Sequence, residues 1–122
     1  MKGEDISDRL LEFAVRIIQL VDALPNTPVG RHIGGQVLGC GTSPGANYEE
    51  ARGAESKADF VHKLGIVLKE LSETRYWIKV LIKSKLIPLK RIQGVFSESD
   101  ELCKIIGKSV ITVKKKQCRS GR

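Results

Sequence analysis

The stretch from Ser56 to Ser84, SKADFVHKLGIVLKELSETRYWIKVLIKS, decides the fold class because it is the strongest helical pattern in the chain. Apolar residues recur in it at steps of three and four, the spacing of an amphipathic α-helix. They are Phe60, Leu64, Val67, Leu68, Leu71, Trp77, Ile78, Leu81 and Ile82, and Val61, Ile66, Tyr76 and Val80 widen the stripe. Ser56 is the expected cap, with Asp59 three residues later. So broad an apolar surface predicts a helix that is buried on more than one side.

A helix is also predicted over residues 5–24. Its apolar residues follow the same steps, which places them on one stripe. They are Ile6, Leu10, Phe13, Ile17 and Leu24. We expect Asp5 or Ser7 to cap the start of this helix and Pro25 to stop it, because proline disrupts a helix interior.

The last predicted helix covers residues 97–115. Ser97 and Ser99 are candidate caps, and acidic residues follow them while lysines lie at the other end, as the helix dipole favours. Its apolar stripe is Leu102, Ile105, Ile106, Val110 and Val113. The preceding residues 89–96, which follow Pro88, are expected to form a separate short turn of helix.

Residues 31–54 carry opposing signals. Its glycines and Pro44 disfavour a helix. Relative to alanine, each interior glycine lowers helix stability by about 1 kcal/mol and an interior proline by about 3 kcal/mol. Spacing favours one, since polar and small residues recur at alternating steps of four and three and would share a helix face. They are Gln36, Cys40, Ser43, Asn47, Glu50 and Ala54. We therefore predict a helix, kinked near Pro44, whose glycines allow close approach of a neighbour.

Four helices with short connections predict an all-α, up-down four-helix bundle that forms a single domain over residues 1–122. Residues 116–122 are expected to be a basic tail. No apolar run approaches the roughly 20 residues of a membrane span. The N-terminus is polar, unlike a secretory leader, and the three cysteines are widely spaced. These features predict a cytoplasmic protein that does not bind membranes.

The formal net charge of +7 comes entirely from the C-terminal end. Residues 1–103 contain 14 basic and 14 acidic residues, whereas seven bases and no acid follow. Such a cluster predicts binding to a polyanion, most often nucleic acid. The alternative is a solubilising helix end, because basic residues also stabilise a helix C-terminus. The residues expected to contact nucleic acid here are Lys108, Lys114, Lys115, Lys116 and Arg119, and those of a second patch are Lys79, Lys83, Lys85, Lys90 and Arg91.

Motifs for catalysis, cofactors or metals are weak. The segment Gly39–Gly45 is glycine-rich, but it lacks the lysine and the following Ser/Thr of a phosphate-binding loop. His32 and His62 stand alone, without a second ligand at helical spacing. Cys40 has no adjacent base to activate it. We therefore expect no catalytic residue, no metal site and no cofactor.

A polar face on the predicted 31–54 helix is more specific. Polar side chains in a core-facing position are costly unless they bond each other or a partner. We expect a structural polar network that sets the bundle's register, and a ligand cavity is the alternative. The residues of this face are Gln36, Ser43, Asn47 and Glu50, and the expected partners in the network are Glu73 and Arg75 of the 56–84 helix.

These residues also resemble a known family. The pattern Gln36-x6-Ser43-x3-Asn47-x2-Glu50, followed by the run Glu73–Trp77, is similar to the four-helix-bundle proteins of the 23S rRNA intervening-sequence family. The resemblance implies a left-handed up-down bundle that assembles into a ring, typically a homopentamer. The accessory proteins of diversity-generating retroelements look similar, and they imply a reverse transcriptase and its RNA as partners.

The function expected from residues and resemblance together is non-enzymatic. We expect an oligomeric bundle that binds RNA, or an RNA-handling protein, through basic surface and C-terminal residues. One alternative is a protein-interaction scaffold without direct nucleic-acid binding. Another is an enzyme or small-ligand binder that uses the polar face.

Overall fold

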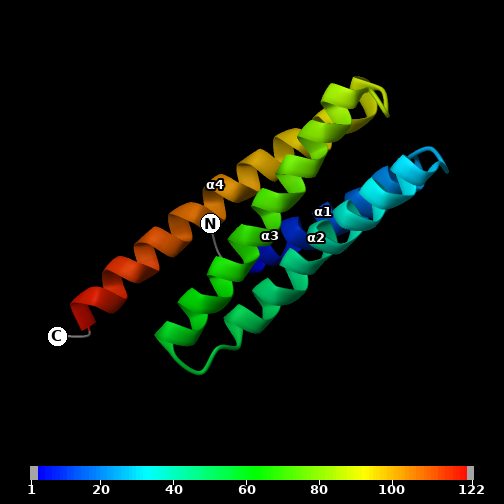
Figure 1. The fold of residues 1–122 in the computed structure, drawn as a ribbon. Helices are drawn as coiled ribbons and strands as arrows, with labels where there is room; N and C mark the ends of the chain where they lie inside the picture. The colour runs from blue at the N-terminus through cyan, green and yellow to red at the C-terminus, as the bar shows by residue number, and fades with distance from the viewer. Residues whose placement is uncertain (1–2, 121–122) are drawn as a thin grey trace.

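The computed structural model describes residues 3–120, except the side chains of Gln117, Arg119 and Ser120. Within this range the chain forms four α-helices and no strand (Figure 1). They are α1 (Gly3–Asp22), α2 (Pro28–Arg52), α3 (Lys57–Ser84) and α4 (Leu89–Ser120). The all-α, four-helix prediction is confirmed.

Each helix packs against the next one along the chain, and α1 also packs against α4 (Figure 1). The connections contain only four or five residues, so each helix must turn back beside its predecessor. Helix α4 is the longest, with 32 residues. Gly3, at the start of α1, and Thr112 of α4 line the same cavity. The turns of α4 that follow Thr112 therefore extend beyond the start of α1.

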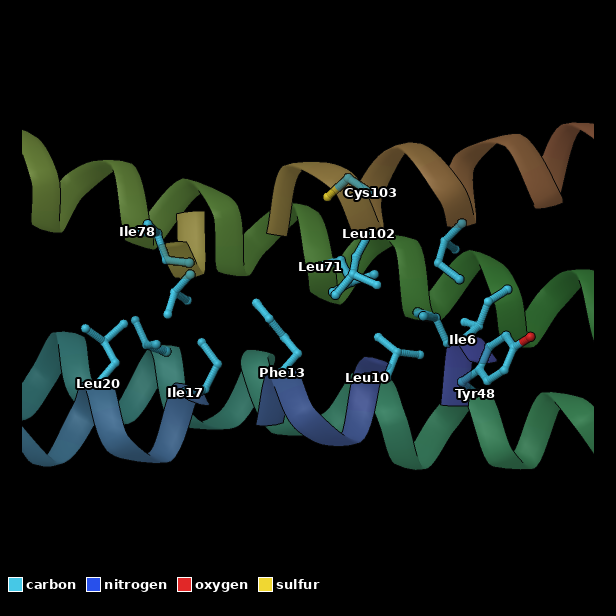
Figure 2. Close-up of a cluster of buried hydrophobic side chains, with 14 of the residues drawn as sticks. Ile6, Leu10, Phe13, Ile17, Leu20, Tyr48, Leu71, Ile78, Leu102 and Cys103 are labelled. Carbon is cyan, nitrogen blue, oxygen red and sulfur yellow. The ribbon is translucent and has the colours of Figure 1, made fainter. Parts of the chain in front are cut away.

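The core is aliphatic. Figure 2 shows the α1 stripe facing residues of α3 and α4, among them Leu71, Ile78 and Leu102. The buried members of the α1 stripe are Ile6, Leu10, Phe13, Ile17 and Leu20. Full burial of one such side chain contributes about 1.5–3 kcal/mol to folding. Leu20 completes the stripe where the sequence pattern indicated Leu24, which is only half-buried.

The glycine-rich segment is helical, as its spacing predicted. Helix α2 runs continuously through Pro44, which is buried. Gly41 faces α1 and has no room for a side chain, because a Cβ there would lie 2.8 Å from Cγ1 of Ile17. Gly41 therefore allows α1 and α2 to pack closely.

Two predicted helix starts are wrong. Helix α1 begins at Gly3, so Asp5 and Ser7 lie inside it rather than capping it. Helix α2 begins at Pro28 rather than at residue 31, and the Thr27 hydroxyl accepts a hydrogen bond from the Gly30 amide. Proline suits the first turn because the amide hydrogen it lacks has no partner there. The Ser56 cap of α3 is confirmed, since its hydroxyl accepts a hydrogen bond from the Asp59 amide.

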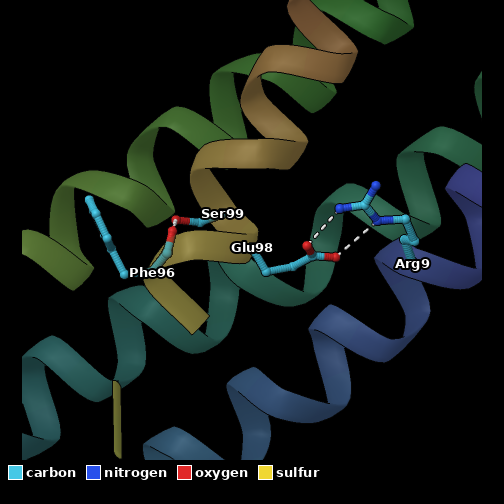
Figure 3. A network of polar contacts seen from close by, with 4 residues as sticks. All are labelled: Arg9, Phe96, Glu98 and Ser99. Carbon is cyan, nitrogen blue, oxygen red and sulfur yellow. Dashed lines mark hydrogen bonds and ion pairs between the residues drawn. The ribbon is translucent and has the colours of Figure 1, made fainter. Parts of the chain in front are cut away.

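The predicted break between residues 89–96 and 97–115 is also wrong, because α4 is one helix. Ser99 is buried and its hydroxyl donates to the Phe96 carbonyl oxygen at 2.7 Å (Figure 3). A serine that bonds the preceding turn in this way remains inside a helix instead of capping a new one. The expected basic tail is helical as far as Ser120.

Candidate nucleic-acid interface

The C-terminal cluster consists of the basic residues Lys108, Lys114, Lys115, Lys116 and Arg119. All four lysines are solvent-exposed on α4, and the side chain of Arg119 lies outside the described part of the chain. Lys108 and Lys115 are seven residues apart and so share a face of the helix. That face points away from the buried stripe that contains Leu102 and Ile106. The cluster is therefore presented to solvent at one end of the bundle.

The hairpin patch consists of the other predicted contact residues, Lys79, Lys83, Lys85, Lys90 and Arg91. All five are exposed around the connection between α3 and α4. These five residues lie near one end of the bundle, on α3, on α4 and in the connection between them, whereas the C-terminal cluster lies at the other end of α4. Arg91 and Lys114 are 23 positions apart on one helix, which corresponds to about 35 Å at 1.5 Å per residue. A single chain offers two separate basic patches.

The charges of the hairpin patch differ in their effect on helix stability. Lys83 lies in the last turn of α3, where the helix dipole favours a cation. Lys90 and Arg91 lie in the first turn of α4, which contains no acidic residue. A cation at a helix N-terminus is unfavourable by about 0.3–1 kcal/mol. The helix dipole therefore does not account for the presence of these two bases.

The predicted polar network does not form as expected. Gln36, Glu50 and Glu73 are exposed, so they do not line a buried face. Ser43 donates to the Gly39 carbonyl oxygen of its own helix. The polar stripe lies along the edge of the α2–α3 contact, where Cys40 is buried, Asn47 is half-buried and Gln36 and Glu50 reach solvent.

The remaining two network residues bond to partners that sequence spacing did not identify. The Asn47 side-chain amide donates to Glu70 Oε1 at 2.8 Å, which links α2 to α3. Arg75 pairs with Asp100 on α4, with Nη1 3.2 Å from Oδ1. These contacts join residues 23 and 25 positions apart, and each connects neighbouring helices.

Asp100 accepts from two bases. Lys104 Nζ lies 3.1 Å from its Oδ2, on the opposite oxygen from Arg75. The hydrogen bond from Lys104, together with the charges of Lys104 and Arg75, lowers the pKa of the Asp100 carboxyl. Lys104 is thus partly neutralised by Asp100.

An ion pair between α1 and α4 was not predicted. Arg9 donates to Glu98 through Nη2 at 2.7 Å and Nε at 3.1 Å, one bond to each carboxylate oxygen (Figure 3). This two-pronged geometry suits the planar guanidinium. The hydrogen bond raises the pKa of Arg9. The partners are 89 positions apart, so nothing in local spacing could have paired them.

The cysteines and histidines form no metal-binding group in the part of the chain described. Cys40 and Cys103 are buried, and burial raises the pKa of both thiols. Cys118 is exposed. Over residues 3–120, no three His, Cys, Asp or Glu side chains are placed to hold a metal ion together. Over the same range, no helix contains an apolar stretch long enough to cross a membrane.

The fold and its exposed bases define a small helical-bundle protein with basic patches at both ends of its longest helix. Residues 4–108 match the family model of the 23S rRNA-intervening sequence protein. The chain belongs to this family, as its sequence pattern suggested.

Among solved structures, the chain is similar to a protein of unknown function from the S23 ribosomal protein family of Bacteroides thetaiotaomicron. The two share 40% identity with a TM-score of 0.82, over 90% of this chain and 98% of the other. No curated protein matches the chain. The family match ends at Lys108, so most of the C-terminal cluster lies beyond the shared region.

Proposed function

We propose that this protein is a non-enzymatic, cytoplasmic bundle that binds RNA, or an RNA-handling protein such as a reverse transcriptase, through its two basic patches. The observation that carries the proposal is the unbalanced charge of α4, where no acidic residue follows Glu101. Polyanion binding exploits such a surface because neutralised phosphates release counterions. Membership of the 23S rRNA-intervening sequence family supports RNA as the polyanion.

The proposal includes self-assembly of an up-down, left-handed bundle into a ring, with a homopentamer as the expected size. Its support is an exposed apolar stripe on α1, formed by Leu11, Val15 and Ile18, which are 65%, 40% and 46% exposed. Leu38 on α2 adds to this surface at 40%. A second copy of the chain would cover it. A ring multiplies the +7 charge of each chain and raises the local field.

RNA binding is tested with a triple variant, Lys114, Lys115 and Lys116 each replaced by Glu. We expect its affinity for a single-stranded RNA to fall and its salt dependence to flatten. Loss of three phosphate contacts reduces the slope of log K against log salt by about 2. Fluorescence anisotropy over a salt series measures both quantities.

Two matched triple variants make this test specific. Lys79, Lys83 and Lys85 to Glu changes the same charge in the hairpin patch and shows whether that patch contributes. The second variant makes the same change of charge on the N-terminal half of α3, outside both patches, by replacing Lys57, Lys63 and Lys69 with Glu. It should weaken binding less. If all three variants lose affinity equally, only net charge matters and the two patches are not the binding surface.

Assembly is tested by native mass spectrometry. Leu11→Glu and Ile18→Glu place a charge on the apolar stripe and should shift a ring toward monomers. Ile111→Glu is the control, because Ile111 is 58% exposed on α4, away from the stripe. A wild-type protein that is monomeric at micromolar concentration would contradict the ring.

A protein-interaction scaffold is the second candidate. The observation that favours it is an open, largely apolar cavity of about 550 Å³ between the start of α1 and the C-terminal half of α4. Phe60, Ile105 and Val113 line it, with Lys108 at its edge. If the purified protein binds no RNA but retains a reverse transcriptase after nuclease treatment, the scaffold function is correct.

A further inference from the structure

A cavity between the C-terminal half of α1 and the first turns of α4 joins Arg91 of the hairpin patch to Arg16, which belongs to neither basic patch. Its volume is about 170 Å³. Arg16 and Gln19 line it from α1 and Arg91 lines it from α4. Leu20 and Val95 contribute an apolar wall. Two arginines from different helices therefore share one small cavity that no acidic residue lines.

Neither arginine is engaged in the folded chain. Among the described residues, no hydrogen bond or ion pair joins the guanidinium of Arg16 or Arg91 to another side chain, in contrast to Arg9 and Arg75. Arg16 is only half-buried, which keeps its donors accessible. Like charges near an apolar wall repel one another in the absence of an anion. No residue that lines the cavity supplies a counter-charge, and a bound anion would provide one.

Gly94 leaves room for the Arg16 guanidinium beside α4. A Cβ at Gly94 would lie 2.7 Å from Nη2 of Arg16, so the guanidinium occupies the space that any other side chain would fill. Glycine within a helix lowers stability relative to alanine. Its presence in α4 is explained by the position of the arginine rather than by the helix.

We propose that this cavity is a binding site for a phosphate group, held by Arg16 and Arg91 with Gln19 as a further donor. A single arginine guanidinium can bind two phosphate oxygens through two parallel hydrogen bonds. The volume resembles that of a 150 Å³ cavity that holds a benzene-sized ligand, well below the 300–1,000 Å³ of most cofactor sites. It suits one phosphate group and excludes a whole cofactor. The phosphate belongs either to an RNA backbone, in which case this inference rests on the proposed function, or to free phosphate.

The test titrates the full-length protein with inorganic phosphate, and separately with a single-stranded RNA, at constant ionic strength. NMR signals of the arginine Nε–H groups report each site. We expect the signals of Arg16 and Arg91 to shift with phosphate. Arg16→Gln should weaken phosphate binding about tenfold or more, the usual effect of losing hydrogen bonds to a charged group.

Two further variants separate position from charge. Gly94→Ala keeps every charge but displaces the Arg16 guanidinium, and it should weaken phosphate binding severalfold while the protein remains folded. Arg31→Gln is the matched control, because it removes one exposed arginine from α2, outside the cavity. It should leave phosphate affinity within about twofold of wild type, since screened charges at a distance contribute little.

The outcomes distinguish the two proposals. If Arg16→Gln weakens phosphate and RNA together, the cavity holds an RNA phosphate. If it weakens phosphate alone, the ligand is free phosphate, and the RNA proposal then depends on the lysine variants. If RNA binds through Lys114–Lys116 while the Arg16 and Arg91 signals respond to neither ligand, the cavity proposal is overturned and the proposed function stands. Phosphate binding that Arg16→Gln and Gly94→Ala leave unchanged also overturns it.

Discussion

Replacing Gly41 by alanine tests how closely α1 and α2 must approach. The new Cβ would lie 2.8, 2.9 and 3.0 Å from Cγ1, Cγ2 and Cδ1 of Ile17. Ile17 is 0% exposed, so its side chain has no solvent to move into. Two of these atoms are attached directly to its branched Cβ, which restricts rotation in a helix. The contact can be relieved only by moving the helices apart.

The magnitude follows from two opposing effects. Overpacking a core costs about 1–3 kcal/mol. Alanine gains about 1 kcal/mol over glycine in a helix. Gly39 lies on the same helix with open space around its Cβ position, so Gly39→Ala has only the gain. The difference in unfolding free energy between the two variants therefore isolates the overpacking, about 1–3 kcal/mol.

Urea unfolding followed by circular dichroism measures both variants, after native mass spectrometry has shown that they assemble alike. Gly65→Ala on α3, also in open space, is a second control for the propensity gain. Adding Ile17→Ala should remove the clash, so its effect in the Gly41→Ala background should be smaller than in wild type. If Gly41→Ala is as stable as Gly39→Ala, the close approach does not constrain the packing of these helices.

Three further predictions concern ionisable groups. A thiol reagent should modify only Cys118 quickly in the folded protein and all three cysteines in urea, because burial protects the other two thiols; fast modification of two or more in native buffer would contradict their placement. The lowered pKa of Asp100 means that its folded carboxyl binds protons less readily than the unfolded one. Its stabilising contribution is therefore complete above the unfolded pKa of about 3.9 and is lost as pH falls through the lower folded pKa. Asp100→Asn should flatten the unfolding free energy below pH 4 relative to wild type, and identical acid profiles would count against these ion pairs. A double-mutant cycle of Arg9→Gln and Glu98→Gln should give a coupling of about 0.5–1 kcal/mol in unfolding free energy, since both side chains are partly exposed, whereas strict additivity would show that the contact contributes nothing.

The four helices and most of their buried faces can be predicted from the linear order of residues. The buried residues from Ile6 to Ile17 are spaced by three and four positions, and this spacing can be read directly from the sequence. The same rule recovered α2 despite its glycines and Pro44. Where local patterns failed, as at Ser99, the residue was compatible with both a helix cap and a helix interior. Packing decided between the two.

The pairing of polar groups, in contrast, depends on how the helices pack against one another. The polar face around Asn47 was expected to bond Glu73 and Arg75, yet Asn47 is paired with Glu70 and Arg75 with Asp100. Contacts such as Arg9 with Glu98, or Arg16 over Gly94, join positions that leave no periodic trace in the sequence. Helix periodicity fixes the direction of a side chain around its own axis, whereas the rotation and offset of one helix against another depend on the summed packing of the whole core.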